Sequence, residues 1–401
     1  MQAKLKTVFL AGTVTIAAAA LIFFPREAVE GSKQGLDMWW QIVFPSLLPF
    51  FIISEILIGF GVVKFIGVLL EPLMRPLFRV PGAGGFVWAM GMASGFPAGA
   101  KLTARLRQEG NLTRTEAERL ITFTNCSNPL FIFGAVAVGF FVNEKLGIIL
   151  ALSHYLGNFT VGIIMRFYGR DEPKPGDNKK FSLRTAFREM HMTRMRDKRP
   201  LGKMMGDAIM SSVHTLLMVG GFIILFSVLN KLLYHLNITA LLSESMKAAL
   251  TLLQLPESLS LPLISGLFEI TLGTKLASEA KDASLMHQTI IASMILAFSG
   301  LSVHAQVASI LAQTDIRYKP FFVSRVLHAF ISGLYVVVFW KPLGRVIQSG
   351  EQPAFFTVQN VEDPPRALAV LSVLKEIGPV ITIAVLIFYI ILASKRMKIL
   401  Q

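Results

Sequence analysis

Apolar runs of about 20 residues, the length of helix that spans the hydrocarbon core of a bilayer, recur along the whole chain between short polar segments. Their positions predict transmembrane spans near residues 8–24, 39–62, 120–141, 146–167, 208–232, 289–311, 321–340 and 377–394. The first run follows two lysines but has no convincing cleavage site, so we interpret it as an uncleaved span. The pattern therefore predicts an all-α polytopic membrane protein with about eight transmembrane helices.

Two further apolar segments, residues 83–103 and 261–278, are interrupted by Gly, Pro, Thr or Glu. They are too broken to cross a membrane as one helix. Non-helical backbone is tolerated at membrane depth only where protein or a cavity surrounds it. We interpret both segments as re-entrant hairpins, which enter the membrane and return to the same side.

The two hairpins belong to an internal repeat with an offset of 174 or 175 residues. GAKLTA at 99–104 aligns with GTKLAS at 273–278, FTNCSNP at 123–129 with FSGLSVH at 298–304, and His154 with His328. Each repeat holds three spans and one hairpin, so the second repeat is inverted in the membrane. Such repeats, each with a broken segment at the corresponding position, are typical of secondary transporters with a site at the midplane. A duplicated structural or receptor-like membrane protein is the alternative.

The repeat divides the chain into five parts. They are an N-terminal span with an outer linker (1–35), the first repeat (36–168), a basic connector (169–203), the inverted second repeat (204–340), and an outer loop with a C-terminal span (341–401).

Composition agrees with a membrane protein, because 53% of residues are hydrophobic, 16% are charged and the mean hydropathy is +0.59. Most of the Lys and Arg behind the net charge of +14 lie with the span ends in segments on one side of the predicted spans, namely the predicted inner loops 64–82, 101–119, 169–203 and 312–319 and the tail from Lys395. The positive-inside rule then places both termini in the cytoplasm. We therefore expect the basic segments to face anionic lipid headgroups of the bilayer, and we expect no nucleic acid partner.

Nothing in the chain indicates an enzyme. Cys126 is the single cysteine, and no zinc, P-loop, Rossmann or nucleophile-elbow spacing is complete. We expect no catalytic residues, no cofactor and no metal site. The sequence leaves homo-oligomerisation open.

The first hairpin carries Gly91, Gly95 and Gly99 four residues apart, followed closely by Pro97 and Lys101. A face without side-chain bulk allows close helix packing. The proline also interrupts the helix, so that backbone amides at the tip can face an anion. Both interpretations can hold together.

Lys101 and Lys275 occupy equivalent positions in the two hairpins. Lys101 fits an interfacial residue on the cytoplasmic side. Lys275 lies on the outer side, where the positive-inside rule gives no reason for it. A carboxylate substrate would give both lysines a partner, whereas pairing of Lys275 with Glu269 is the structural alternative.

Polar residues interrupt the third and sixth predicted spans, in TFTNCSNP and FSGLSVHAQ. At this density they either contact a substrate in a cavity or form hydrogen bonds between helices. With the hairpin residues they make up the candidate binding set: Ser94, Gly95, Gly99, Lys101, Asn125, Ser127, Asn128, Glu269, Thr271, Thr274, Lys275, Ser299, Ser302, His304 and Gln306.

Three ionisable residues in apolar stretches are candidates for coupling. Glu55 lies in FIISEILIGF, where it either carries a coupling proton or forms a buried hydrogen bond. His154 and His328 lie in less polar surroundings, where a histidine is more often a packed side chain.

Five long motifs carry a resemblance to a known family: LDMWWQIVFPSLLPFFI, LLEPLMRPLFRVPG, WAMGMASGFPAGAKLTARL, FTNCSNPLFIFGAVAVGFF and HYLGNFTVGIIMRFYG. They resemble sporulation integral membrane proteins with two nucleoside-recognition Gate domains, which are distantly similar to concentrative nucleoside transporters. The resemblance runs almost from end to end. It implies that two hairpins and two broken helices form the site. Unlike the nucleoside carriers, the hairpin segment SGFPAGAK contains no carboxylate.

The resemblance also implies a function in an endospore-forming bacterium. It is that of a carrier that moves dipicolinic acid, a small aromatic dicarboxylate, from the mother-cell cytoplasm across the outer forespore membrane into the intermembrane space. A location in the mother-cell membrane, a nucleoside or other small-solute permease, and a non-transporting sporulation scaffold are the alternatives.

Overall fold

Residues 2–169 and 183–348 are described by the computed structural model, and every regular element in them is helical. They belong to one compact unit, residues 1–348. The all-α fold class is therefore confirmed. The predicted span 377–394 lies outside the described residues.

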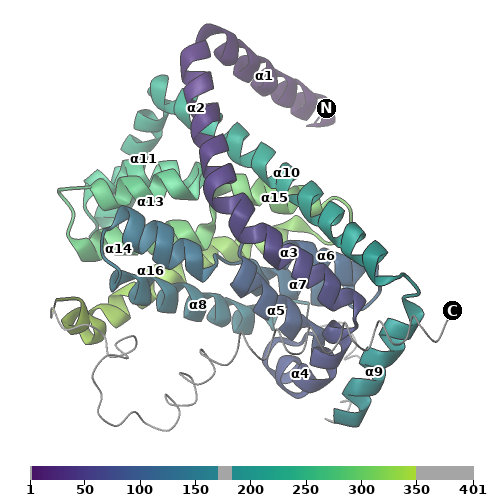
Figure 1. Cartoon of the computed structure of the whole chain (residues 1–401). Coiled ribbons are helices and arrows are strands. Elements are labelled where there is room, and N and C mark those ends of the chain that lie inside the picture. The colour runs from purple at the N-terminus through teal and green to yellow at the C-terminus, as the bar shows by residue number, and fades with distance from the viewer. Residues whose placement is uncertain (1, 170–182, 349–401) are drawn as a thin grey trace. The chain divides into compact units, whose positions relative to one another are not determined.

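The first half of the chain contains eight α-helices and two π-helical segments. In order these are α1 (Gln2–Phe23), α2 (Pro25–Met38), η1 (Trp39–Val43), α3 (Phe44–Gly59), α4 (Val62–Phe78), α5 (Ala83–Ser94), α6 (Ala98–Gln108), α7 (Arg114–Thr124), η2 (Leu130–Phe140) and α8 (Leu146–Met165). Figure 1 shows α4 to α7 gathered on one side of the unit.

The second half begins in the connector and repeats much of this order. Its elements are α9 (Leu183–Arg196), α10 (Leu201–His235), α11 (Ile238–Leu252), the short 3-10 helix η3 (Glu257–Leu259), α12 (Ser260–Phe268), α13 (Ile270–Glu279), α14 (Leu285–Phe298), α15 (Gly300–Leu311) and α16 (Tyr318–Gln348). The helix pairs α5–α6 and α12–α13 are the two predicted hairpins.

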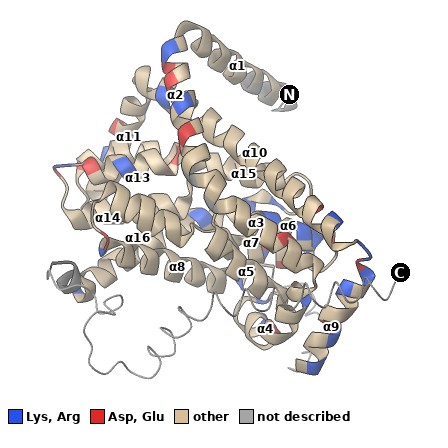
Figure 2. Cartoon of the chain, viewed as in Figure 1, with Lys and Arg blue, Asp and Glu red and all other residues tan. Residues whose placement is uncertain are grey.

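Four described helices are long and apolar enough to cross a membrane: Leu146–Met165, Leu201–His235, Leu285–Leu311 and Tyr318–Leu343. The number rises to six if two bent pairs, Ala11–Phe23 with Pro25–Gln41 and Leu47–Gly59 with Val62–Phe78, each count as one span. Figure 2 shows Lys and Arg gathered around α6 and α9, whereas α8 and α14 carry no charge. The chain is an integral membrane protein with several apolar helices.

The predicted loop 64–82 is wrong, because residues Val62–Phe78 form α4. Hydropathy reports contact with lipid, not helicity, and the charges of α4 find partners on the protein. Arg75 forms ion pairs with Glu71 and with Glu116 of α7. The helices α10 and α16 also extend beyond the predicted spans 208–232 and 321–340.

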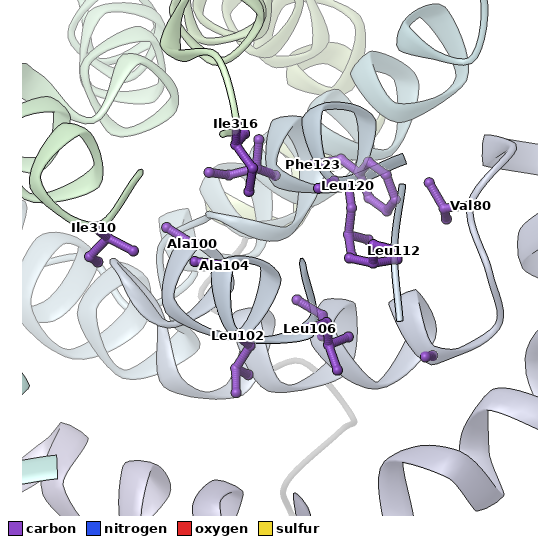
Figure 3. Close-up of a cluster of buried hydrophobic side chains, with 14 of the residues drawn as sticks. Val80, Ala100, Leu102, Ala104, Leu106, Leu112, Leu120, Phe123, Ile310 and Ile316 are labelled. Carbon is purple, nitrogen blue, oxygen red and sulfur yellow. The ribbon is translucent and has the colours of Figure 1, made fainter. Parts of the chain in front are cut away.

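The first hairpin is fixed by an apolar core, drawn in Figure 3. Leu102 and Leu106 of α6 are buried, and they belong to one cluster with Leu120 and Phe123 of α7 and Ile310 of α15. Since α15 belongs to the second half, this cluster joins the two halves through the body of the first hairpin.

Candidate functional site

A pocket of about 690 Å³, its mouth included, lies between the hairpin tips and the two broken helices. Its polar lining comprises Ser94 and Gly95 of the first hairpin, Ser127 and Asn128 of the first break, Glu269 and Thr271 of the second hairpin, and Ser302 and Gln306 of α15. The apolar lining comprises Met38, Val43, Leu47, Phe96, Leu130, Phe131, Val219, Ile223, Ile270 and Val303. All eight polar positions are predicted site residues.

The two hairpin tips reach this pocket from different directions. The turn of the first is at Gly95, which has a φ of +83° and lines the pocket. The turn of the second is at Glu269, whose extended backbone separates α12 from α13. Figure 1 shows α5 and α6 on one side of the unit and α13 on the other. The two hairpin tips therefore meet at the pocket, and the helices of the two hairpins extend from it in different directions. An inverted repeat requires this arrangement.

Two glycines of the first hairpin pack closely against the first broken helix. A Cβ added at Gly91 would lie 1.9 Å from the carbonyl oxygen of Thr124, and one added at Gly99 would lie 2.1 Å from the same atom. Close packing therefore explains these two glycines. Gly99 does not line the pocket, and of the three predicted glycines Gly95 alone reaches it.

The first broken helix is unwound over residues 125–128, between α7 and the turn that leads into η2. Asn128 connects this break to the hairpin, because its side-chain amide donates to the carbonyl of Ser94 at 3.0 Å. Its Oδ1 accepts from the amide of Phe131 at 2.8 Å. The side chain of Asn125 is fully buried and does not line the pocket. Asn128 thus serves both the fold and the pocket.

The second broken helix is interrupted at one residue only. Ser299 has a φ of +74° and separates α14 from α15. His304 bonds through Nδ1 to the Tyr318 hydroxyl at 2.6 Å and through Nε2 to the Phe298 carbonyl at 3.0 Å. Ser299 and His304 therefore stabilise the kink, whereas Ser302 and Gln306 on the same segment line the pocket.

Glu269 is the one charged residue that the described part of the chain contributes to the lining of this pocket. Its side chain caps α13, because Oε2 accepts from the amide of Leu272 at 2.8 Å. The amides at this helix N-terminus therefore already face a carboxylate of the protein. Glu269 forms no ion pair with Lys275 among the described residues, so the structural alternative for Lys275 is not what the structure shows.

The two lysines do not meet in the pocket. Lys101 lies 3.3 Å from Glu55 Oε1 and contacts Ser211 of α10. Arg105 also pairs with Glu55. Lys275 is exposed on α13, and the neighbouring Thr274 is buried with its hydroxyl bonded within the helix. The predicted pair of lysines around one carboxylate is therefore not formed in this structure.

The candidate coupling residues also lie outside the pocket lining. Glu55 is buried and joins α3 to α6 through the two cations just described. The ring centroids of His154 and His328 lie 4.8 Å apart with the rings tilted by 52°, and His328 Nε2 lies 2.8 Å from the carbonyl of His154. The repeat-related histidines thus contact each other where α8 packs against α16.

Sequence reasoning missed Arg325, which is fully buried in α16 and bonds to the first break. Its signal was present, because a charged residue inside the apolar run FFVSRVLHAF is rare in a span and marks a functional or structural site. Within the ranges 2–169 and 183–348, no group of three or more His, Cys, Asp or Glu residues is placed to hold a metal ion.

Comparison with known families agrees with this architecture. The profile described as nucleoside recognition (Gate) matches residues 40–145 and 216–314, just over half of the chain. The chain belongs to the Gate family. Each matched range contains one hairpin and the broken helix that follows it.

Among the relatives of this Gate protein is the sporulation integral membrane protein YlbJ of Bacillus subtilis. It is 56% identical over 98% of this chain and 97% of its own length, so the two proteins belong to one family. An uncharacterized protein of Alkalihalophilus pseudofirmus is 34% identical over 25% of this chain and 20% of its own. A structure of a CNTnw variant in an outward-facing state covers 82% of this chain and 87% of that chain, at 12% identity and a TM-score of 0.35.

Proposed function

We propose that this Gate protein is a carrier, not an enzyme, and that it moves dipicolinate across the outer forespore membrane into the intermembrane space. The single observation that carries a transport function is the pocket, which collects polar groups from the hairpin and the broken helix of both halves. Rocking of one half against the other would open such a pocket alternately to the two sides. Dipicolinate itself is supported by membership in the family of YlbJ, a sporulation protein.

The pocket suits a small planar ring with polar substituents. Phe96, Phe131 and Ile223 supply apolar surface for the ring. The hydroxyl of Ser94 is buried, lines the pocket and has no hydrogen-bond partner among the described residues. A buried hydroxyl without a hydrogen-bond partner destabilises the protein, and an oxygen atom of a ligand would accept the missing hydrogen bond.

Glu269 determines how a dicarboxylate would bind. Two carboxylates in a poorly solvated pocket repel each other unless they share a proton. We propose that one carboxyl of the substrate and the carboxyl of Glu269 share a proton. The second carboxylate of the substrate accepts hydrogen bonds from neutral donors such as Ser94 and Gln306. Binding would then bring one proton with each substrate anion.

A nucleoside or another uncharged solute is the second candidate, and Glu269 favours it. A carboxylate accepts strong hydrogen bonds from sugar hydroxyls, and no Lys or Arg of the described residues lines the pocket. The two candidates therefore differ in what Glu269 does, since it accepts hydrogen bonds from a nucleoside, whereas a dicarboxylate binds beside it only with the uptake of a shared proton.

Glu269→Gln separates the candidates. We would measure the Tm of the purified protein and flux in proteoliposomes, with dipicolinate and with uridine. For a dipicolinate carrier, dipicolinate stabilises the wild type and stabilises Glu269→Gln at least as well, because the amide removes the repulsion. For a nucleoside carrier, uridine stabilises the wild type and the effect is lost in Glu269→Gln.

Lys275→Ala is the matched control, because Lys275 is exposed on the same helix. It should respond to ligand like the wild type. Absence of flux and of stabilisation by either compound in all three proteins would instead support a non-transporting scaffold.

A further inference from the structure

Arg325 is the largest side chain that is fully buried among the described residues, and it lies in the apolar part of α16. No carboxylate lies within ion-pairing distance of it in the part of the chain that the structure describes; the guanidinium contacts instead neutral groups. An unpaired charge in this setting is expensive. Arg325 must therefore receive compensation of another kind.

The compensation comes from oxygen atoms at the end of α7. Nη1 of Arg325 donates to the carbonyl of Asn125 at 3.0 Å, and Nη2 donates to the carbonyl of Thr122. Nη2 also donates to Oδ1 of Asn158 at 3.0 Å, and Nη1 lies 3.1 Å from Nδ1 of His328. Nη1 and Nη2 thus contact only acceptors that carry partial negative charge, whereas Nε has no hydrogen-bond partner among the described residues.

These carbonyls need partners because α7 stops at Thr124. The last carbonyls of a helix receive no hydrogen bond from an N–H group of the same helix, and they form the negative end of the helix dipole. Asn158 bonds the carbonyl of Phe123, and the hydroxyl of Tyr155 bonds that of Ser127 at 3.1 Å. Arg325 supplies the positive charge among these neutral donors.

The second break has a different arrangement at the equivalent place. The carbonyl of Phe298 receives the hydroxyl of Ser299 and Nε2 of His304. No guanidinium contacts the end of α14 in the described ranges. The arginine is therefore not required by the repeat as such, because the second half stabilises the end of its half-helix without one.

We propose that Arg325 is a tethered cation, which takes the place of a mobile coupling cation at the first broken helix. Unwound carbonyls and half-helix C-termini in the membrane are a setting in which transporters coordinate Na⁺. Here the guanidinium fills that setting and fastens α16 to the unwound segment 125–128. This break then needs no metal cation in any state in which the contact persists, whatever solute the pocket takes.

The test uses the full-length protein in detergent, with Tm as the measurement and no solute added. Exchange of Na⁺ for choline at equal ionic strength should leave the Tm of the wild type unchanged. Arg325→Ala should lose several degrees. Millimolar guanidinium should restore part of that loss, because the truncated side chain leaves room for the ion among the same carbonyls. Arg325→Met fills the space without charge and should not respond to guanidinium.

Arg26→Ala is the control, because Arg26 is exposed and, within residues 2–169 and 183–348, pairs only with Glu30 on its own helix. Its Tm should not respond to guanidinium or Na⁺. A gain in wild-type Tm with Na⁺ over choline overturns the proposal, and this comparison needs no variant to fold. Wild-type stability in Arg325→Met also overturns it, because packing alone would then suffice. Neither result bears on which solute the pocket carries.

Discussion

In the first half of the protein the broken helix leaves residues 125–128 outside any regular helix, whereas in the second half α14 passes to α15 across Ser299 alone. Two glycines of the hairpin pack against the backbone beside the longer break. Asn158 of α8 and Arg325 of α16 donate hydrogen bonds to backbone carbonyls at this break. The shorter break is held mainly by His304. The longer unwound segment exposes more backbone, so it needs more partners.

The hairpins differ as well. The first brings a buried serine and a glycine turn to the pocket and no charge, whereas the second brings Glu269. The lysines at the aligned positions also differ, since Lys101 is held by Glu55 and Lys275 is exposed. The two halves thus share the positions of the backbone breaks, whereas the side chains at equivalent positions differ in charge and in contacts.

The largest effect is expected where the hairpins approach other backbone. In Gly99→Ala the new Cβ would lie 2.1 Å from the oxygen and 2.3 Å from the carbon of the Thr124 carbonyl, and in Gly273→Ala 2.1 Å from the Cα of Gly266. We expect each to cost about 3 kcal/mol or more, because backbone must move. Gly202→Ala, with no atom within 4 Å of the added Cβ, is the control. Equal Tm values for the three variants would show that neither hairpin is fixed as described.

Asn128→Ala and Ser302→Ala compare the pocket residues of the two halves. Asn128 bonds two backbone groups, so its loss should cost about 2–3 kcal/mol and abolish stabilisation by ligand. Ser302 lines the pocket from a regular helix, so its loss should weaken the ligand response and leave the Tm of the unliganded protein nearly unchanged. Thermal unfolding with and without ligand gives both quantities. A ligand response unchanged in both variants would move the binding site elsewhere.

Lys101→Ala and Lys275→Ala compare the aligned lysines. Removal of Lys101 deprives buried Glu55 of one of its two cations and should cost about 1–2 kcal/mol, since Arg105 remains. Lys275 is exposed, and its removal should change stability by less than about 0.5 kcal/mol. Denaturation of the two purified variants measures this difference. The reverse order would show that Lys275 stabilises the fold and that the contact of Lys101 with Glu55 does not.

The smallest effect concerns the contact that joins the halves at the start of α7. Burial alone would raise the pKa of Glu118, but hydrogen bonds from Arg317 and Tyr168 outweigh it and hold that pKa below its usual range. A lowered pKa contributes stability above the unfolded value of about 4.3, and the contribution disappears as pH falls through the folded value. Glu118→Gln should therefore lower Tm at pH 7, and the difference from wild type should shrink towards acid pH. A difference independent of pH would assign the effect to packing.

Sequence could predict the hairpins and both breaks because they depend on local chemistry. Glycine, proline and clustered polar residues interrupt an apolar run wherever they stand, and the repeat offset of 174 residues showed that the interruptions correspond. The same reasoning failed for residues 64–82, since charged residues that find partners on the protein do not stop a helix. It also overlooked Arg325, whose partners lie about 200 residues away.

The sequence by itself thus determined the membrane-protein class, the two hairpins, the two broken helices and the eight polar residues that line the pocket. Only the tertiary structure decided the surroundings of each charged side chain. Lys101 lies beside Glu55, and Lys275 is exposed on the surface of α13. Glu269 lines the pocket, and Arg325 bonds to the end of α7. The physical reason is that a break in a helix is encoded within a few residues. The partner of a buried charge is supplied by a helix that is distant in the sequence.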